Sequence, residues 1–310
     1  MVNKHSTWIY EQPLIIVIER RRENYTFRIS DSALNIRRII LNVDWTRRAE
    51  NVLFLLSLGF IGFVIWHSLL FASFTIPTRS MVPTVKPGDK VLVDKVTTGA
   101  RIFDIFDAAA GKEVTIRRTP RFRKFRRGDC LVFNFPFCGE WKHIAMDYHT
   151  YYLKRCVGVP GDTLSIRNFR YYINGKPSVG GGDPLKMEEI FPLDMENIDS
   201  LPGFRALKCD TVKHWTIRDL GPLWIPKKGE EIQLTAANYY PYRKAIEWET
   251  GKKLKRLGAE VTLDGKILKS YRFRENYYFM AGDNAADSQD SRYWGFVPEP
   301  FIVGRMLCRY

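Results

Sequence analysis

The apolar positions of the chain fall into one long run and several short ones. From Val52 to Phe74, 23 residues pass without Asp, Glu, Lys or Arg, and only His67 can titrate. As a helix this run would be about 34 Å long, enough to cross a hydrocarbon core of about 30 Å. A buried helix of a soluble protein rarely stays uncharged on every face, and a cleaved export signal begins nearer the N-terminus with a shorter apolar core. The pattern therefore predicts a transmembrane helix at residues 52–74.

The charges that flank this run leave its orientation open. Four cations lie near each end of it, so the positive-inside rule does not choose a direction. Long domains cross a membrane largely regardless of charge, which allows a short tail inside and a large domain outside. The apolar run Leu14–Ile18 in the tail is too short to span a bilayer. We therefore expect a cytoplasmic tail at residues 1–51 and an extracytoplasmic domain at residues 75–310.

Beyond the long run, the pattern changes to short alternating segments rich in β-branched and aromatic residues. Five of them predict strands: 90–96, 130–135, 163–166, 170–173 and 277–280. Turn sequences such as Asn174-Gly175 and Asp264-Gly265 lie between them. Residues 235–258 are polar with scattered aromatics and are expected to hold one helix. The whole pattern favours a mainly β, antiparallel fold over alternating helices and strands.

Composition narrows the class of protein. The chain has 310 residues, with 48 Lys and Arg against 34 Asp and Glu, a formal net charge of +14. Charged residues make up 26%, an ordinary share for a globular protein, which argues against a disordered chain, a collagen or a polytopic transporter. The charge excess suits nucleic acid, an anionic membrane surface or solubility alone. The five cysteines show no C-x-x-C spacing and the histidines no H-E-x-x-H pair, so no metal or other cofactor is expected. The sequence does not decide whether two of the cysteines form a disulfide.

Three segments carry candidate chemistry. Residues 75–84 hold Ser80 between Pro77 and Pro83, which restricts the backbone and fixes the direction of the hydroxyl. Residues 152–162 hold Lys154 within a strand pattern, an unusual place for an ammonium group without a partner. Taken alone, the serine is most simply a turn residue and the lysine an outward-facing strand residue.

The third segment, residues 282–298, is a loop dense in side-chain acceptors, followed by an aromatic run. Asp283, Asp287 and Asp290 alternate with small residues, as in a calcium-binding loop. The segment lacks the EF-hand spacing and its terminal bidentate Glu, so metal binding is the weaker interpretation.

Together, these segments resemble the type I signal peptidases, the membrane-bound Ser-Lys leader peptidases of bacteria. The matching blocks are P-T-R-S-M-V-P-T at 77–84, R-G-D-C-L-V-F at 127–133, Y-L-K-R-C-V-G-V-P-G-D at 152–162 and G-D-N-A-A-D-S-Q-D-S-R-Y-W-G-F-V-P at 282–298. The stretch at about 165–270 matches only loosely. The resemblance implies an antiparallel β-sheet catalytic domain with an inserted second β-rich region, anchored by the transmembrane helix.

The resemblance also implies a serine nucleophile, Ser80, and a lysine general base, Lys154. No Ser-His-Asp set is apparent, so a Ser-Lys pair is the natural alternative. The lysine must then be neutral, which requires its pKa to fall by roughly three units, or about 4 kcal/mol of desolvation. A dry, strand-lined site can supply that shift.

Other residues match family positions with supporting roles. The hydroxyl of Thr78 is implied to join the backbone N–H of Ser80 in an oxyanion hole. Ser288 matches the residue that orients the lysine. The remaining implied roles are a buried structural ion pair and one side chain of the substrate pocket: Asp290, Arg292 and Met81. Ala285, Ala286 and Asp287 depart from the Arg-Asp and Asn usual in the family, which puts the hydrogen bonds of that turn in doubt.

The implied activity is removal of signal peptides from exported pre-proteins at a bacterial cytoplasmic membrane, after small residues in an A-x-A-like arrangement. The basic stretch 117–127, RRTPRFRKFRR, suits a solvated loop, an anionic lipid surface or nucleic acid. Because this stretch would lie in a membrane-anchored enzyme, we expect phospholipid as its partner and do not expect nucleic acid.

Two other functions stay open. One is a catalytically inactive, membrane-anchored binding or assembly protein of the same fold, for which Ser80→Ala and Lys154→Ala would change nothing. The other is a self-cleaving repressor with a Ser-Lys pair. The uncharged span and the lack of a recognisable helix-turn-helix segment argue against the repressor.

Overall fold

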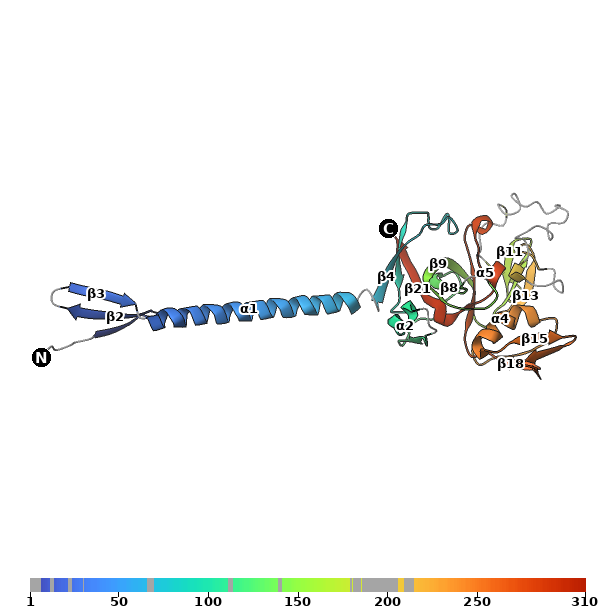
Figure 1. The fold of residues 1–310 in the computed structure, drawn as a ribbon. Helices are drawn as coiled ribbons and strands as arrows, with labels where there is room; N and C mark the ends of the chain where they lie inside the picture. Colours follow the sequence, from blue (N-terminus) through green and yellow to red (C-terminus); the bar gives the residue numbers. More distant parts are fainter. Residues whose placement is uncertain are drawn as a thin grey trace. The chain divides into compact units, whose positions relative to one another are not determined.

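The computed structural model divides the chain into two compact units, Met1–Ile65 and Trp66–Tyr310. It describes residues 7–11, 14–21, 24–29, 31–65, 70–110, 114–138, 141–178, 180, 185, 206–208 and 215–310. Figure 1 draws the fold along the chain.

The first unit consists of a small sheet followed by one long helix. Strands β1 (Thr7–Glu11), β2 (Leu14–Arg21) and β3 (Asn24–Ile29) form an antiparallel sheet in that order. Helix α1 (Asp31–Ile65) follows. From Val52 to Val64 its large apolar side chains are 42–67% exposed.

The helix predicted at residues 52–74 has different bounds in the structure. Helix α1 begins at Asp31 and ends at Ile65, whereas Phe71–Thr75 forms strand β4. Strand β4 pairs in antiparallel register with β5, Phe71 opposite Asp94 and Thr75 opposite Lys90. The prediction of helix as far as Phe74 was therefore wrong, because pairing with a distant strand determines the conformation there. Within the described part of the chain, no helix is both long enough and apolar enough to cross a membrane.

A seven-stranded antiparallel sheet organises the second unit. Its order is β20-β19-β9-β8-β21-β5-β4. The strands not yet given are β5 (Lys90–Asp94), β8 (Cys130–Phe135), β9 (Asp147–Gly158), β19 (Tyr277–Ala281), β20 (Val297–Pro298) and β21 (Ile302–Arg309). Shorter elements connect them: β6 (Arg101–Ile102), α2 (Ile105–Ala109), β7 (Arg117–Arg118), the 3₁₀ turns Ala285–Asp287 and Glu299–Phe301, and α5 (Ser291–Trp294).

A second β-rich region lies between β9 and β19 in the sequence. It has a four-stranded sheet of order β12-β11-β10-β13, a β14-β18 pair and a β15-β16-β17 meander. The bounds are β10 (Thr163–Arg167), β11 (Arg170–Ile173), β12 (Lys176–Pro177), β13 (Leu220–Trp224), β14 (Glu231–Gln233), β15 (Leu254–Leu257), β16 (Glu260–Leu263), β17 (Lys266–Ile267) and β18 (Ser270–Arg272). Helix α4 (Tyr239–Thr250) and a 3₁₀ turn (Ala206–Lys208) complete it.

The mainly antiparallel β fold is confirmed, and all five predicted strands are present. The Asn174-Gly175 and Asp264-Gly265 turns have positive φ at both residues, 53° and 79° in the first and 48° and 82° in the second. Such pairs match the twist of a two-residue hairpin. The helix predicted within 235–258 exists, but it ends at Gly251 in the left-handed conformation, and Leu254–Leu257 is a strand.

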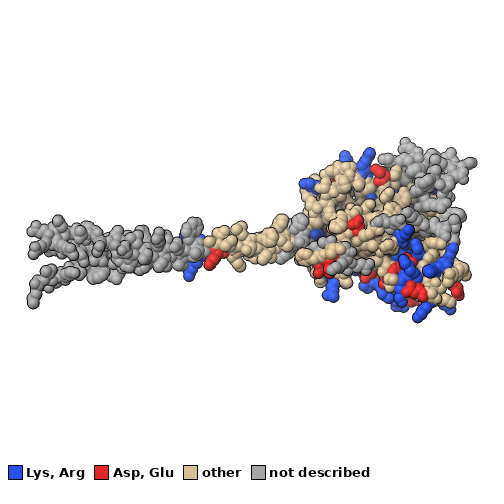
Figure 2. Space-filling model, in the orientation of Figure 1, with Lys and Arg blue, Asp and Glu red and all other residues tan. Residues whose placement is uncertain are grey.

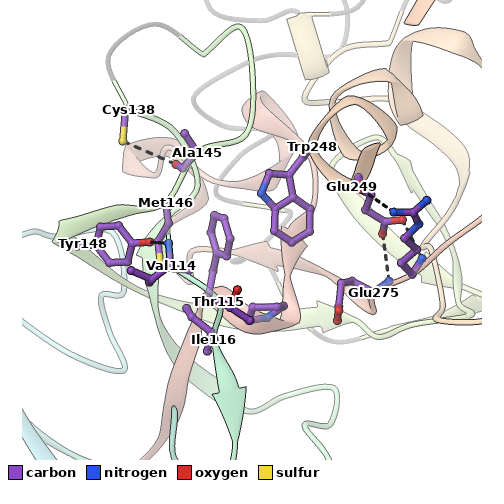
Figure 3. Close-up of a pocket in the computed structure, with 13 residues that line it drawn as sticks. Val114, Thr115, Ile116, Cys138, Ala145, Met146, Tyr148, Trp248, Glu249 and Glu275 are labelled. Carbon is purple, nitrogen blue, oxygen red and sulfur yellow. Dashed lines mark hydrogen bonds between the residues drawn. The ribbon is translucent and has the colours of Figure 1, made fainter. Parts of the chain in front are cut away.

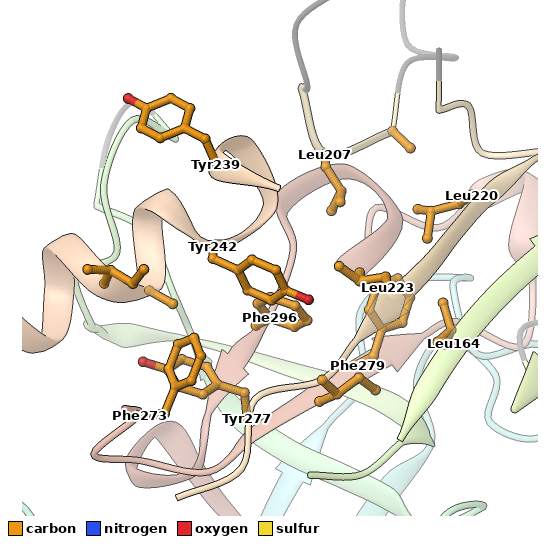
Figure 4. Close-up of a cluster of buried hydrophobic side chains, with 14 of the residues drawn as sticks. Leu164, Leu207, Leu220, Leu223, Tyr239, Tyr242, Phe273, Tyr277, Phe279 and Phe296 are labelled. Carbon is orange, nitrogen blue, oxygen red and sulfur yellow. The ribbon is translucent and has the colours of Figure 1, made fainter. Parts of the chain in front are cut away.

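A shared core joins the second β-rich region to the seven-stranded sheet. Side chains of β10, β13 and α4 are buried together with Tyr277 and Phe279 of β19. Figure 4 shows Tyr242 against Phe296, whose rings are stacked with centroids 5.9 Å apart. Because each large aromatic buries much apolar surface, this cluster holds β19, and the loop that follows it, firmly against α4.

The basic charge is concentrated at one end of the second unit. Residues 251–274 contain eight Lys and Arg against two Asp and Glu. Figure 2 shows blue side chains gathered over the end formed by α4, β15 and β18. The basic stretch 117–127 is therefore not the only source of the net charge.

Candidate active site

Ser80 lies on a tightly held loop that follows strand β4. The backbone of Ile76 donates to the Asp89 carbonyl at 2.9 Å, and Gly88 donates back to the Ile76 carbonyl at 2.8 Å, which closes the loop at its base. Gly88 adopts a φ of 92°, a conformation that favours glycine. The Ser80 side chain is 7% exposed, so the hydroxyl is fixed rather than free in solvent.

Lys154 reaches this hydroxyl from the middle of the sheet. It lies on β9, directly opposite Leu131 of β8, and is only 2% exposed. Its Nζ lies 2.6 Å from Ser80 Oγ, within hydrogen-bond distance. The sequence-predicted nucleophile and base are thus in direct contact, although 74 residues separate them in the chain.

The surroundings of Lys154 favour its neutral form. Burial lowers the pKa of its ammonium group from 10.5 to about 8. Asp290 opposes this by attraction, and Arg292 adds to it by repulsion. Desolvation is the main cause, as expected for a cation taken out of water. A base with a pKa near 8 is suited to accept a proton from a serine hydroxyl near neutral pH.

The loop after β19 packs directly on the serine loop. Asn284 N donates to the Ser80 carbonyl at 3.0 Å, and its side-chain amide donates to the Arg79 carbonyl at 3.2 Å. A Cβ at position 282 would overlap both Ser288 Oγ and the Ser80 carbonyl oxygen. Glycine at this position therefore allows the two loops to touch at the site.

Asp290 and Arg292 form the buried ion pair expected from the sequence. Arg292 Nε and Nη2 donate to the two carboxylate oxygens at 2.8 and 2.9 Å, and both side chains are at most 1% exposed. Burial alone would raise the pKa of Asp290, but Arg292 holds it below its usual value. The arginine also donates to the Ala285 carbonyl at 2.8 Å, so the turn keeps a hydrogen bond where the sequence departs from the family.

The other sequence-predicted residues lie close to this pair. Thr78 Oγ1 is 3.3 Å from Ser80 Oγ. The Ser288 hydroxyl is buried and donates to Asp290 Oδ2 at 2.8 Å; among the described residues, no hydrogen bond joins it to Lys154. Met81 is fully buried in the cluster beneath the serine loop, with Val85 and Leu153.

A second ion pair near the site was not expected from the sequence. Arg155, next to the base, donates from Nε to Asp283 Oδ1 at 2.6 Å. The hydroxyl of Thr84 donates to the other oxygen of the same carboxylate. The network ties β9, the serine loop and the loop after β19 together. Its only sequence signal was the position of Arg155 and Asp283 beside predicted site residues.

Two of the three carboxylates considered for calcium are engaged by arginines instead: Asp283 with Arg155 and Asp290 with Arg292. Within the described residues, no group of three or more His, Cys, Asp or Glu is arranged to hold a metal ion. The described cysteines carry free thiols, and Cys209 lies outside the described residues.

The basic stretch 117–127 is largely engaged within the protein. Three of its arginines form ion pairs at 2.5–2.8 Å: Arg121 with Glu299, Arg123 with Asp129 and Arg127 with Asp162. Phe125 is buried, whereas Phe122 is 84% exposed. A lipid contact of this stretch stays a prediction, and Phe122 is the side chain available for it.

The sequence of the chain is similar to those of known proteins. The family model described as "Signal peptidase, peptidase S26" matches residues 48–310. Signal peptidase I of Buchnera aphidicola subsp. Acyrthosiphon pisum is 26% identical over 266 residues, covering 80% of this chain and 70% of that protein. Signal peptidase I of Pseudomonas fluorescens is 28% identical over 253 residues, covering 78% and 65%. A crystal structure of a signal peptidase I from Enterococcus faecalis V583 shares 19% identity and a TM-score of 0.29, covering 60% of this chain and 98% of that one. Since the family model covers most of the sequence, the chain belongs to the signal peptidase family, peptidase S26.

Proposed function

We propose that the chain is a serine endopeptidase that removes signal peptides from exported pre-proteins, with Ser80 as nucleophile and Lys154 as general base. The observation that carries this proposal is the 2.6 Å contact between Lys154 Nζ and Ser80 Oγ in a buried site. Burial brings the pKa of the amine to about 8, so a useful fraction is neutral near pH 7.

The geometry supports a two-step acyl transfer. Neutral Lys154 accepts the proton of Ser80 as Oγ attacks the carbonyl carbon of the scissile peptide bond. The resulting oxyanion is held by the Thr78 hydroxyl and the backbone N–H of Ser80, and the lysine then gives its proton to the leaving amine. Water, deprotonated by the same lysine, next attacks the acyl-serine ester, which releases the signal peptide and restores the hydroxyl.

Three residues hold this arrangement rather than react. We assign Ser288 and the Asp290–Arg292 pair to positioning, because Ser288 donates to Asp290 and Gly282 N donates to the same carboxylate at 3.0 Å. Met81 is fully buried, so we assign it to the packing beneath the serine loop, where it would support a subsite for the small residues of the substrate from below.

We further propose that the protein is held at the bacterial cytoplasmic membrane by the uncharged end of α1, with its catalytic domain on the extracytoplasmic side. Support comes from the stretch from Val52 to Val64, which exposes its apolar side chains. As a helix this stretch is about 20 Å long, shorter than a hydrocarbon core of about 30 Å.

The test uses the full chain in detergent with a signal-bearing precursor. Cleavage is followed by gel mobility and by N-terminal sequencing of the mature product. Ser80→Ala and Lys154→Ala are expected to lose cleavage, while the matched variants Ser73→Ala and Lys86→Ala, both at exposed positions, are expected to keep it.

The same experiment separates the peptidase from its alternative. If the chain is an inactive binding protein of this fold, neither the wild type nor the variants at positions 80 and 154 will cleave the precursor. Equal cleavage by the wild type and the Lys154→Ala variant would instead remove the lysine from the mechanism.

A further inference from the structure

The second unit contains a pocket that shares no residue with the catalytic pair. Its volume is about 580 Å³, within the range of ligand-binding pockets. Segments far apart in the sequence line it: the loop before β7, the β8–β9 connection, the end of α4 and the loop between β18 and β19. It therefore exists only in the folded unit, and the proposed peptidase mechanism makes no use of it.

The walls of the pocket are mainly apolar and aromatic. Figure 3 shows Tyr148 and Met146 on one side, Glu249 and Glu275 on the other, and Trp248 between them. The Trp248 ring meets Phe301 edge-on, with centroids 5.4 Å apart, and Phe301 is only 2% exposed. Packing of this kind fixes the walls before any ligand arrives, which lowers the entropic cost of binding.

One of the two carboxylates in the pocket is already used by the protein. Glu249 accepts hydrogen bonds from the hydroxyls of Tyr271 and Tyr277, each at 2.8 Å. It also accepts from the backbone N–H of Arg274 at 2.8 Å and of Glu275 at 3.1 Å. Four donors satisfy this carboxylate, so Glu249 holds the loop after β18 against α4.

The other carboxylate, that of Glu275, is left with a weaker partner. Its ion pair is to Lys228, whose Nζ lies 3.8 Å from Oε1 and whose side chain is 63% exposed. Burial raises the pKa of Glu275; the attraction of Lys228 opposes this rise, and Glu299 and Glu249 add to it. Since Lys228 is exposed and its contact with Glu275 is long, a better-placed cation can displace it.

Among the lining residues that the structure describes, the only other charged side chain is Arg274, which donates from Nη1 to the Glu249 carbonyl at 3.2 Å. This bond holds the guanidinium at the end of α4. The described lining then carries two carboxylates and one guanidinium beside aromatic rings, and the exposed Lys228, outside the lining, is the counter-charge of Glu275. Cations with an apolar body are the ligands that such surroundings attract, through the carboxylate and the ring faces.

We infer that this pocket binds an organic ammonium group attached to an apolar body, with Glu275 as the ionic contact and Trp248, Tyr148 and Phe301 as the walls. A lysine side chain in a peptide and a free amine both have this chemistry.

Binding is measured by isothermal titration calorimetry on the full chain in detergent, with 2-phenylethylammonium as the probe and 2-phenylethanol as its uncharged counterpart. Blank titrations into detergent alone correct for partition of each probe. The wild type is expected to prefer the ammonium roughly tenfold, an interaction difference of about 1.4 kcal/mol. Equal affinity for the two probes, or none for either, would overturn the inference.

Two variants and one control locate the binding. Glu275→Gln removes the charge and is expected to abolish the preference, whereas Glu260→Gln, at an exposed position of β16, is expected to retain it. Trp248→Leu should lower the affinity for both probes, because it removes an aromatic wall of the pocket. An unchanged preference in Glu275→Gln would place the amine elsewhere. Precursor cleavage by Glu275→Gln should equal that of the wild type, which shows that the variant is folded and separates this site from the proposed catalytic one.

A pair of peptides distinguishes the two sources of the ammonium group. Acetyl-Leu-Lys-Leu-amide is compared with the same peptide carrying norleucine, which keeps the aliphatic chain without the charge. Tighter binding of the lysine peptide than of 2-phenylethylammonium identifies a protein segment as the ligand, and weaker binding identifies a free amine. No discrimination between the two peptides, together with none between the two small probes, would refute the site.

Discussion

The pH dependence of cleavage is the sharpest test of the proposed base. Lys154 must be neutral to accept the proton of Ser80, and burial gives it a pKa of about 8. At pH 7 roughly one molecule in ten then carries a neutral amine, against about three in ten thousand for an ordinary lysine. Desolvation of this one side chain thus raises the population of active enzyme roughly 300-fold at neutral pH.

The assay measures kcat/KM for a signal-bearing precursor between about pH 5.5 and 10, because this parameter reports the free enzyme. We expect a rise of about tenfold per pH unit below pH 8 and a plateau above it. Circular dichroism at each pH checks that the protein stays folded. A rate that is flat between pH 6 and 9, or one that begins to level only near the pKa of an exposed lysine, would refute the reasoning.

Three substitutions test the surroundings of the pair. Thr78→Val removes a proposed oxyanion donor and should lower kcat roughly a hundredfold with little change in KM, while Thr78→Ser should restore most of the rate. Gly282→Ala places a methyl group 2.6 Å from the Ser80 carbonyl oxygen and against Ser288, so the two loops must move apart and kcat should fall even in protein that urea unfolding shows to be folded; an active variant would show that the loops can separate without loss of function. Arg292→Met leaves the buried carboxylate of Asp290 unpaired, which should destabilise the fold by about 3–5 kcal/mol. The pKa of Lys154 should then increase, so the midpoint of the pH rise in kcat/KM should move above 8. An unmoved midpoint would exclude this electrostatic role of Arg292.

The strands could be predicted from the sequence because their signals are local. Alternation of apolar and polar residues and the turn pairs at 174–175 and 264–265 determine each hairpin within a few residues. The pairing of Ser80 with Lys154 was also expected, because the residues around both form dense family blocks; their catalytic roles stay a prediction. Direct contact between the two side chains, however, depends on the order of strands in the seven-stranded sheet.

One error arose where a distant partner determines the local structure. Phe71–Thr75 continues an apolar run that suits a helix, yet its pairing with β5 makes it a strand. Residues 254–257, inside the range expected to hold a helix, instead form a local hairpin with β16, so this boundary was missed although the partner is near in sequence. The pocket lined by Trp248 and Glu275 could not be predicted from the sequence, because its walls come from segments more than a hundred residues apart.

The electrostatics of the proposed active site show how two arginines help Lys154, the proposed base, to stay neutral. Asp290, Asp287 and Asp283 all act on Lys154 in the direction that raises its pKa. Asp290 and Asp283 are bound by Arg292 and Arg155, so each presents a nearly neutral pair to the lysine, whereas Asp287 is exposed and water screens its charge. The loop after β19 can then use carboxylates to hold the serine loop in place without supplying the lysine with a counter-ion. Desolvation remains the dominant effect, and the amine is left with the serine hydroxyl as its partner.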